Sequence, residues 1–331
     1  PDAVTAGLRA RADQWRDTVD LSDEPLISLI QQDEIDILVD LAGHTSHHRL
    51  LLFARKPAPV QVSYLGYPCT TGLSTLDYRL TDAIADPPGE PACHTEELVR
   101  LEPSFCCYAP PADAPDVAAA PAHGNGFLTF GSLHKLEKLN DAVLDAWSRI
   151  LKEIPSARLL LCRHVLGGKT ADLLRARFGQ RGVHSERLLL RTAEPANLQH
   201  LRLYEEIDIA LDTWPWNGHT TACEALWMGV PVLTLRGKRH ASRMVASVLN
   251  CLDLSEWIAD TPEDYICRAA SCADRRQALA DLRATLRDRL RRSPLCDARS
   301  FCRGLEATFR GLWRHWCENT SPPEHGSFRF P

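Results

Sequence analysis

The sequence lacks the features that would assign it to a membrane, secreted or nucleic-acid-binding class. No apolar run approaches the roughly 20 residues that a membrane span needs, and no apolar signal segment stands at its start. The formal charge is −5 and the pI is near 6.2, without a basic stripe interleaved with aromatic residues. We therefore expect a cytoplasmic protein with neither a nucleic-acid nor a membrane partner.

The twelve cysteines follow neither a disulfide framework nor a zinc-binding pattern. They are scattered, and Cys162 and Cys223 stand inside apolar runs, as buried reduced thiols commonly do. The other cysteines lack the paired spacing of zinc ligands. The sequence therefore predicts no metal site and no bound cofactor.

The 331 residues are 44% hydrophobic and 24% charged, which is typical of a globular protein with room for two domains. Short β-branched runs alternate with helical patterns, the signature of parallel sheets in an α/β fold. Strands are predicted at 35–41, 60–64, 77–81, 127–130, 157–162, 187–190, 207–212 and 230–235. Helices are predicted at 26–32, 50–54, 140–154, 170–178, 198–206, 220–228 and 242–249, with a helical tail from residue 262.

Residues 102–126 are rich in Pro, Ala and Gly with little periodicity, which favours a linker. We predict a Rossmann-like N-terminal half over residues 1–110 and a linker over 111–125. A second Rossmann-like domain with its helical tail should cover 126–318, and a flexible tail 319–331.

The most informative stretch begins at Asp212, where a buried strand ends and a loop leads to a helix starting near Thr220. Ligands of open α/β sheets bind beyond such strand ends, and unpaired helical N–H groups suit a diphosphate. Thr220 and Thr221 add hydroxyl donors, and Gly218 permits close backbone approach. Glu224, one turn later, could accept from ribose hydroxyls. The alternative is an ordinary capped core helix.

A second candidate is Lys135, which follows the predicted strand at 127–130. A lysine there could neutralise a phosphate leaving group, although a solvated loop lysine is the simpler interpretation. His200 could stack on or hydrogen-bond a base, but a single histidine is more often structural.

Two motifs in the first half also follow strands. Gly43 precedes His44 and Thr45, and Arg49 lies one helical turn later, where it could bind an anion or an acceptor group. Gly66-Tyr67-Pro68 follows the next strand. The alternative for both is plain turn chemistry.

Taken together, these residues resemble the catalytic region of the O-linked N-acetylglucosaminyltransferase family, which includes plant SPINDLY-type enzymes and bacterial tetratricopeptide-repeat glycosyltransferases. The matching stretches occur in the family's order: IDILVDLAGHT, FARKPAPVQVSYLGYPCTTG, FGSLHK, IDIALDTWPWNGHTTACEALWMGVPVLTLRG and ASRMVAS. They extend from about Asp2 to Trp313, and so long and ordered a match favours the functional interpretations.

The resemblance implies a GT-B fold of two facing Rossmann-like domains. It also implies an inverting, metal-independent transfer of N-acetylglucosamine from UDP-N-acetylglucosamine to Ser or Thr hydroxyls of a protein or peptide. On the family's pattern, Lys135 binds the donor phosphates and helps the leaving group depart. His219–Thr221 forms the phosphate-binding turn and helix start, His200 lies at the nucleotide, and Gly66 and Pro68 approach the transferred sugar.

Three departures leave the donor open. The family's ribose-binding acidic residue is often Asp, whereas this sequence has Glu224. A donor-facing glutamine of some relatives is replaced by Ser132, and a lysine before the nucleotide histidine by Asn197. The same fold with a UDP-hexose or GDP-fucose, and a non-catalytic nucleotide-sugar-binding scaffold, are therefore alternatives.

The family's first domain opens with a strand and a histidine-bearing loop upstream of anything that corresponds to Pro1. We therefore expect this chain to be a fragment with an incomplete first domain, weakly active or inactive alone, and preceded by tetratricopeptide repeats in the full-length protein.

Overall fold

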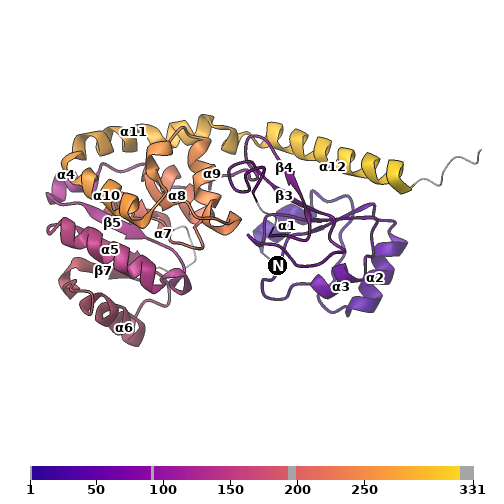
Figure 1. The fold of residues 1–331 in the computed structure, drawn as a ribbon, viewed down its shortest axis with the longest axis horizontal. Coiled ribbons are helices and arrows are strands. Elements are labelled where there is room, and N and C mark those ends of the chain that lie inside the picture. The colour runs from indigo at the N-terminus through magenta and orange to yellow at the C-terminus, as the bar shows by residue number, and fades with distance from the viewer. Residues whose placement is uncertain (1, 91–92, 193–198, 321–331) are drawn as a thin grey trace, which may run out of the picture. The chain divides into compact units, whose positions relative to one another are not determined.

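The computed structural model describes residues 2–90, 93–192 and 199–320, and the chain divides into two compact units (Figure 1). Unit 1 comprises Pro1–Arg79, Cys93–Leu98 and Phe309–Pro331. Unit 2 comprises Leu80–Ala92 and Val99–Thr308, so the predicted linker at 111–125 lies within it. Most of the predicted flexible tail, residues 321–331, and Asn197 lie outside the described residues.

Unit 1 is built around a small sheet whose strand order is β1-β2-β3-β4. The pairs β1–β2 and β2–β3 are parallel, and strands 35–41, 60–64 and 77–81 are confirmed within two residues. Its core gathers Leu26, Leu50, Leu52, Phe53 and Leu76. The elements are α1 (Ala3–Arg9), α2 (Asp23–Gln32), β1 (Ile37–Asp40), α3 (Leu50–Ala54), β2 (Val60–Ser63), β3 (Tyr78–Thr81) and β4 (Glu97–Arg100), of which the last two strands end in unit 2.

Unit 2 contains a six-stranded sheet in the order β10-β9-β8-β5-β6-β7, with every neighbouring pair parallel. Its strands are β5 (Thr129–Ser132), β6 (Arg158–Cys162), β7 (Leu188–Arg191), β8 (Ile209–Leu211), β9 (Val232–Leu235) and β10 (Ile258–Ala259). This is the doubly wound Rossmann order, in which the direction of winding reverses between the first and fourth strands of the unit. The carboxyl ends of β5 and β8 therefore mark the place where such folds bind ligands.

The helices of unit 2 pack on this sheet and on one another. They are α4 (Pro121–Asn125), α5 (Asp141–Glu153), α6 (Gly168–Gly179), α7 (Gln199–Arg202), α8 (Thr220–Trp227), α9 (Met244–Asn250), α10 (Pro262–Ser271) and α11 (Arg276–Arg292). The last helix, α12 (Ala298–Thr320), begins in unit 2, and its residues from Phe309 onward belong to unit 1. The predicted cap of α5 is confirmed, because the Asn140 side chain accepts from the Val143 N–H. Trp147 and Ile150 on the apolar face of α5 are fully buried, and α10 packs against this helix.

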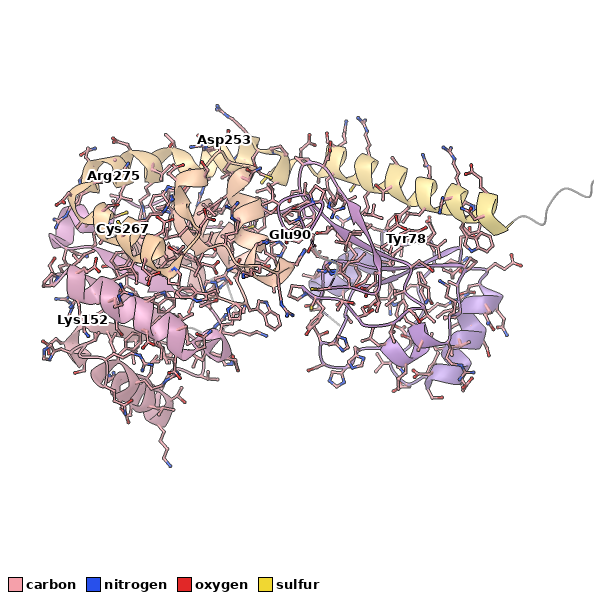
Figure 2. All side chains as sticks on the ribbon, viewed as in Figure 1. Tyr78, Glu90, Lys152, Asp253, Cys267 and Arg275 are labelled. Atoms are coloured by element: carbon pink, nitrogen blue, oxygen red, sulfur yellow. The ribbon has the colours of Figure 1, made fainter. Side chains whose placement is uncertain are left out.

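The segment 80–90 is fastened to the rest of unit 2 by its acidic side chains. Asp82 accepts from the Phe105 N–H at 2.9 Å, and His240 Nδ1 lies 2.8 Å from Asp86 Oδ2. The Arg243 guanidinium donates two hydrogen bonds to Glu90, which is labelled in Figure 2. These contacts tie the loop after β3 to the segment between β9 and α9.

None of the twelve cysteines, all of which lie within the described residues, is part of a disulfide, and Cys162 and Cys223 are buried as predicted. Burial holds the pKa of the Cys223 thiol well above its ordinary value. Within the described ranges, no helix combines the length and apolar character of a membrane span.

The arginine-rich helix α11 directs part of its charged side chains into the protein. Arg283 is buried and donates to the carbonyl oxygens of Ala118, Tyr204 and Ile207 at 2.7–2.8 Å. Arg287 likewise donates to the carbonyls of Trp227 and Pro115. The Pro/Ala-rich segment is thus held to α11, because each guanidinium donates to main-chain carbonyls of this segment and of neighbouring elements.

We expect Arg283→Met to lower the free energy of unfolding by about 3 kcal/mol, because the carbonyls of Ala118, Tyr204 and Ile207 lose their guanidinium hydrogen bonds. Urea unfolding of the chain measures this. Arg292→Met, at an exposed position of the same helix, is the control and should change stability by less than about 0.5 kcal/mol. Equal effects of the two substitutions would contradict this account of α11.

Candidate active site

The loops that follow β5 and β8 are joined by a chain of buried polar groups. Ser132, the last residue of β5, places its Oγ 2.8 Å from Nδ1 of His134. Nε2 of His134 lies 3.1 Å from Oδ1 of Asp212, which directly follows β8. Ser132 is therefore engaged within the protein at the reversal of strand order.

Asp212 organises the loop that leads into α8. Its side chain is fully buried, and its oxygens accept from the Gly218 N–H at 2.7 Å and the Thr234 hydroxyl at 2.6 Å. Its main-chain carbonyl accepts from the Tyr265 hydroxyl at 3.1 Å. The two hydrogen bonds to the carboxylate and the one to the carbonyl fix Asp212 in place, and the bond to Gly218 therefore holds the turn at 217–219 in one position.

Gly218 has no room for a side chain. A Cβ at this position would lie 2.3 Å from Nε2 of His134, which is itself buried. From the sequence, Gly218 was expected to let a ligand approach the backbone closely. The structure adds a second reason for it, the close packing of the turn on the His134 ring.

His219 stands immediately before α8 and faces inward. Its ring stacks on Phe105 with the centroids 5.2 Å apart. Its Nε2 is buried and has no hydrogen-bond partner among the described residues. Burial lowers the pKa of His219 to about 4, so the imidazole is neutral at physiological pH.

The start of α8 is open where a ligand would meet it. Thr220 is exposed and Thr221 half-buried, and the first N–H groups of a helix have no partner within it. The Tyr204 hydroxyl donates to the Thr221 carbonyl at 3.0 Å, which anchors this end of the helix. The predicted helix start is confirmed, and Gly229 past its end has the left-handed φ of 77° expected there.

His200 and Glu224, predicted separately for the nucleotide and the ribose, are brought together. His200 Nε2 lies 3.3 Å from Glu224 Oε1, and both side chains are partly exposed. Glu224 lies one turn into α8, so the pair flanks the helix start with polar atoms that remain accessible.

The two lysines of the loop between β5 and α5, Lys135 and Lys138, differ in their burial. Lys135 is exposed. Lys138 is half-buried, donates from Nζ to the Asn217 carbonyl at 2.6 Å, and lies 5.3 Å from the centre of the Trp216 ring. Burial lowers the pKa of Lys138 to about 8, although the Asp212 charge opposes the shift.

Lys138 was missed by sequence reasoning, which stopped at the first lysine of this loop. The sequence offered one signal for it. Lys138 stands three residues after Lys135 in the same short loop between β5 and α5. Spacing alone did not reveal which of the two is buried against Asn217. Among the described residues, no group of three or more His, Cys, Asp or Glu side chains is placed to hold a metal ion.

In unit 1, the loop after β1 is tightly built. Asp40 accepts from the Gly43 N–H, and Gly43 is left-handed with no space for a Cβ beside Tyr67. His44 is exposed at this loop, and its Nε2 lies 2.9 Å from the Thr71 carbonyl. The exposed Thr45 donates its hydroxyl to the Ala42 carbonyl.

The loop after β2 packs directly on the loop after β1. A Cβ on Gly66 would lie 1.7 Å from the Leu41 carbonyl oxygen, so only glycine fits. Pro68 is buried in the same loop. The structure thus brings His44, Thr45, Gly66 and Pro68 together at one end of this sheet.

Arg49 is placed elsewhere and has a structural environment. Its guanidinium donates to the Asp23 carboxylate at 3.1 Å and to the carbonyls of Thr18 and Leu21. These bonds connect α3 to the segment before α2. These bonds engage both terminal nitrogens of the guanidinium within unit 1, and the predicted role of Arg49 in binding an anion or an acceptor stays a prediction.

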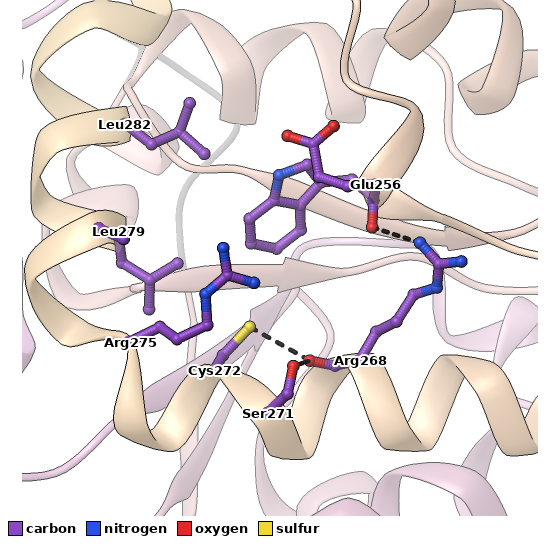
Figure 3. A pocket seen from close by; sticks show the side chains of 9 residues that line it. Glu256, Arg268, Ser271, Cys272, Arg275, Leu279 and Leu282 are labelled. Carbon is purple, nitrogen blue, oxygen red and sulfur yellow. Dashed lines mark hydrogen bonds between the residues drawn. The ribbon is translucent and has the colours of Figure 1, made fainter.

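A separate pocket of about 320 Å³ lies beside α10 and α11 (Figure 3). Arg268 there donates to the Glu256 carbonyl at 2.6 Å and to Asp264 at 2.8 Å. Trp257, Leu279 and Cys272 give the pocket apolar walls. It lacks the convergent strand ends and open helix start that mark the region around Asp212.

We expect Gly218→Ala to destabilise the chain by about 1–3 kcal/mol, because the added methyl group must displace the buried His134 ring. Gly304→Ala in α12, where nothing lies within 4 Å of an added Cβ, is the matched control. It should be neutral or stabilising by up to about 1 kcal/mol. Urea midpoints of both variants measure the difference, and an unchanged midpoint for Gly218→Ala would refute the packing argument.

Comparisons with known proteins bear on the family and the fold of this chain. The SPINDLY protein of Petunia hybrida, a probable UDP-N-acetylglucosamine–peptide N-acetylglucosaminyltransferase, is 42% identical over 312 residues, which cover 93% of this chain and 33% of that protein. The Arabidopsis thaliana SPINDLY protein is 41% identical over 313 residues, covering 93% and 34%. The chain thus spans about a third of the length of these relatives.

Solved structures support the fold. The K341M mutant of Thermobaculum terrenum O-GlcNAc transferase matches with a TM-score of 0.91 and 42% identity, covering 97% of this chain and 61% of that one. Anabaena HepE, solved with UDP and glucose, matches with a TM-score of 0.55 at 12% identity and so supports the fold alone. The predicted α/β fold class with parallel sheets and a helical tail is confirmed.

The model of glycosyl transferase family 41 matches residues 11–107 and 123–305, most of the chain. The family anticipated from the motifs is therefore confirmed, and the chain belongs to glycosyl transferase family 41.

Proposed function

We propose that the chain is the donor-binding and catalytic region of an enzyme that transfers N-acetylglucosamine from UDP-N-acetylglucosamine to Ser or Thr hydroxyls of a protein or peptide. The observation that carries this proposal is the convergence of Lys138, the turn at 217–219 and the open start of α8 at the reversal of strand order. The names of the relatives supply the sugar and the acceptor class.

The diphosphate would sit at the start of α8. Partial positive charge at a helix start favours a phosphate, and the Thr220 and Thr221 hydroxyls can donate to it. Glu224 and His200 would take the ribose and the base, since the accessible carboxylate can accept from hydroxyls and the ring offers a face and a nitrogen.

Lys138, rather than Lys135, is proposed to meet the phosphate charge. Its ammonium is held against Asn217, one residue before Gly218, and is partly desolvated, which strengthens its interaction with an anion. The predicted catalytic role of Lys135 remains a hypothesis that the same experiment tests. One preorganised donor of this kind is worth about 3–4 kcal/mol in the transition state.

The proposed reaction inverts the anomeric centre. The acceptor oxygen bonds to the anomeric carbon as the bond from that carbon to the diphosphate oxygen breaks, and the electron pair departs with UDP. The proton of the acceptor hydroxyl passes to a general base. With cations and helix N–H groups meeting the charge on UDP, we propose that the reaction needs no divalent metal.

The residues of unit 1 are assigned by their motifs. We propose His44, Thr45, Gly66 and Pro68, which gather beyond the ends of β1 and β2, for the sugar and acceptor side, and the predicted role of Arg49 in binding an anion or an acceptor stays a hypothesis. A cytoplasmic location and tetratricopeptide repeats remain predictions for the full-length protein.

We expect Lys138→Met to weaken UDP binding at pH 7 at least tenfold, and Lys135→Met to change it less than threefold. Calorimetry with EDTA present, using UDP, GDP and UDP-N-acetylglucosamine, measures this. In the wild type, affinity should fall as pH rises through about 8, because the Lys138 ammonium is lost there. The Lys138→Met variant should lack this dependence.

The outcomes separate the alternatives. A larger loss in Lys135→Met than in Lys138→Met would return the role to Lys135. Preference for GDP over UDP would point to another donor, such as GDP-fucose. Absence of binding to any of these nucleotides would contradict the proposed function.

A further inference from the structure

Arg163 occupies a position at the candidate site that the proposed function does not use. It directly follows β6, which pairs with β5 so that Leu161 lies opposite Ser132. Arg163 therefore lies one strand from the β5 end, at the same edge of the sheet. Its side chain is half-buried, and Nε is buried without a hydrogen-bond partner among the described residues.

The charge of Arg163 acts on two groups near the turn into α8, in agreement with its place after β6, which pairs with β5. It contributes to the lowered pKa of Lys138, whose Nζ donates to the Asn217 carbonyl. It also opposes the burial that raises the pKa of Tyr204, whose hydroxyl donates to the Thr221 carbonyl. Asn217 and Thr221 bracket the turn, so the guanidinium is within electrostatic reach of both of its ends.

No carboxylate of the described residues forms an ion pair with Arg163. Arg177 and Arg181, by contrast, both pair with Asp141. A half-buried cation beside a second cation is unfavourable, and a buried N–H without an acceptor costs free energy. An anion bound between these groups would remove both penalties. The planar guanidinium fork fits phosphate oxygens especially well.

We propose that Arg163 is a second cation of the donor site, whose guanidinium donates to the diphosphate of the nucleotide sugar together with Lys138. The inference rests on the proposed function and adds a binding residue to it. Arg163 then stabilises the bound donor and the charge that UDP carries away. The alternative ligand for Arg163 is a carbonyl oxygen of the base, which carries no phosphate and can be tested apart.

The test is titration of UDP and of uridine into the chain and its Arg163→Gln and Arg163→Lys variants, by calorimetry and by NMR respectively. A hydrogen bond to a charged group corresponds to roughly tenfold to a hundredfold in affinity. We expect Arg163→Gln to lose that much affinity for UDP and to bind uridine as the wild type does. Arg163→Lys, which keeps the charge without Nε, should lose less.

Arg175→Gln is the matched control, because Arg175 lies on the adjacent helix α6 in an exposed pair with Asp172. It should bind UDP as the wild type does. Arg163→Gln should also shift the fall in UDP affinity to higher pH, because the pKa of Lys138 rises once a neighbouring positive charge is removed. That shift reports only that the two charges are close, so the loss of UDP affinity with uridine binding retained is the result that distinguishes a diphosphate contact from a structural role.

Unchanged UDP affinity in Arg163→Gln, with the wild type binding UDP, overturns this inference and leaves the proposed function standing. An equal loss of uridine and UDP affinity also overturns it and assigns Arg163 to the base or to packing. If Arg163→Gln does not fold, Arg163→Lys is the deciding variant. Full UDP affinity in Arg163→Lys would show that the guanidinium fork makes no specific contact, and it would overturn the inference. Absence of UDP binding by the wild type contradicts the proposed function itself.

Discussion

The buried carboxylate of Asp212 holds the candidate site in shape. It accepts hydrogen bonds from the Thr234 hydroxyl of β9 and from the Gly218 N–H in the turn before α8. Nε2 of the buried His134, in the loop after β5, lies 3.1 Å from its Oδ1. A buried charge is tolerated when its oxygens are fully engaged. Because these partners come from three strands at the reversal of strand order, one side chain sets where α8 begins.

The charge arrangement around this anchor favours an anion. Lys138 is partly desolvated and near Arg163 and Lys135, while His219 stays neutral through burial. The helix start adds partial positive charge in the same region. Cations gathered in this way repel one another, and the proposed diphosphate would relieve that repulsion. The fold alone would not predict this, because Rossmann sheets serve many ligands.

Much of the fold was predictable because its signals are local. The buried strands, the Asn140 cap and the α8 start follow from apolar runs and turn residues next to one another in the sequence. Short strands such as β4 and β10 carry too few residues for a periodic signal. The loops that form the candidate site were also predictable, because strand ends and helix starts are local features of the sequence.

The remaining features depend on contacts between distant residues. Lys135 and Lys138 look alike in the sequence, and only packing against Asn217 separates them. Arg49 and Arg283 look like surface arginines, yet their partners lie 26 or more residues away along the chain. Spacing cannot report such burial, because it is set by the tertiary fold.

The most direct test of the central claim is a crystal structure of the chain with UDP. The account predicts the diphosphate at the start of α8, with its oxygens in contact with the Thr220–Thr221 segment and the Lys138 ammonium. Density for UDP elsewhere, for example in the pocket beside α10 and α11, would contradict the claim that the ends of β5 and β8 form the donor site.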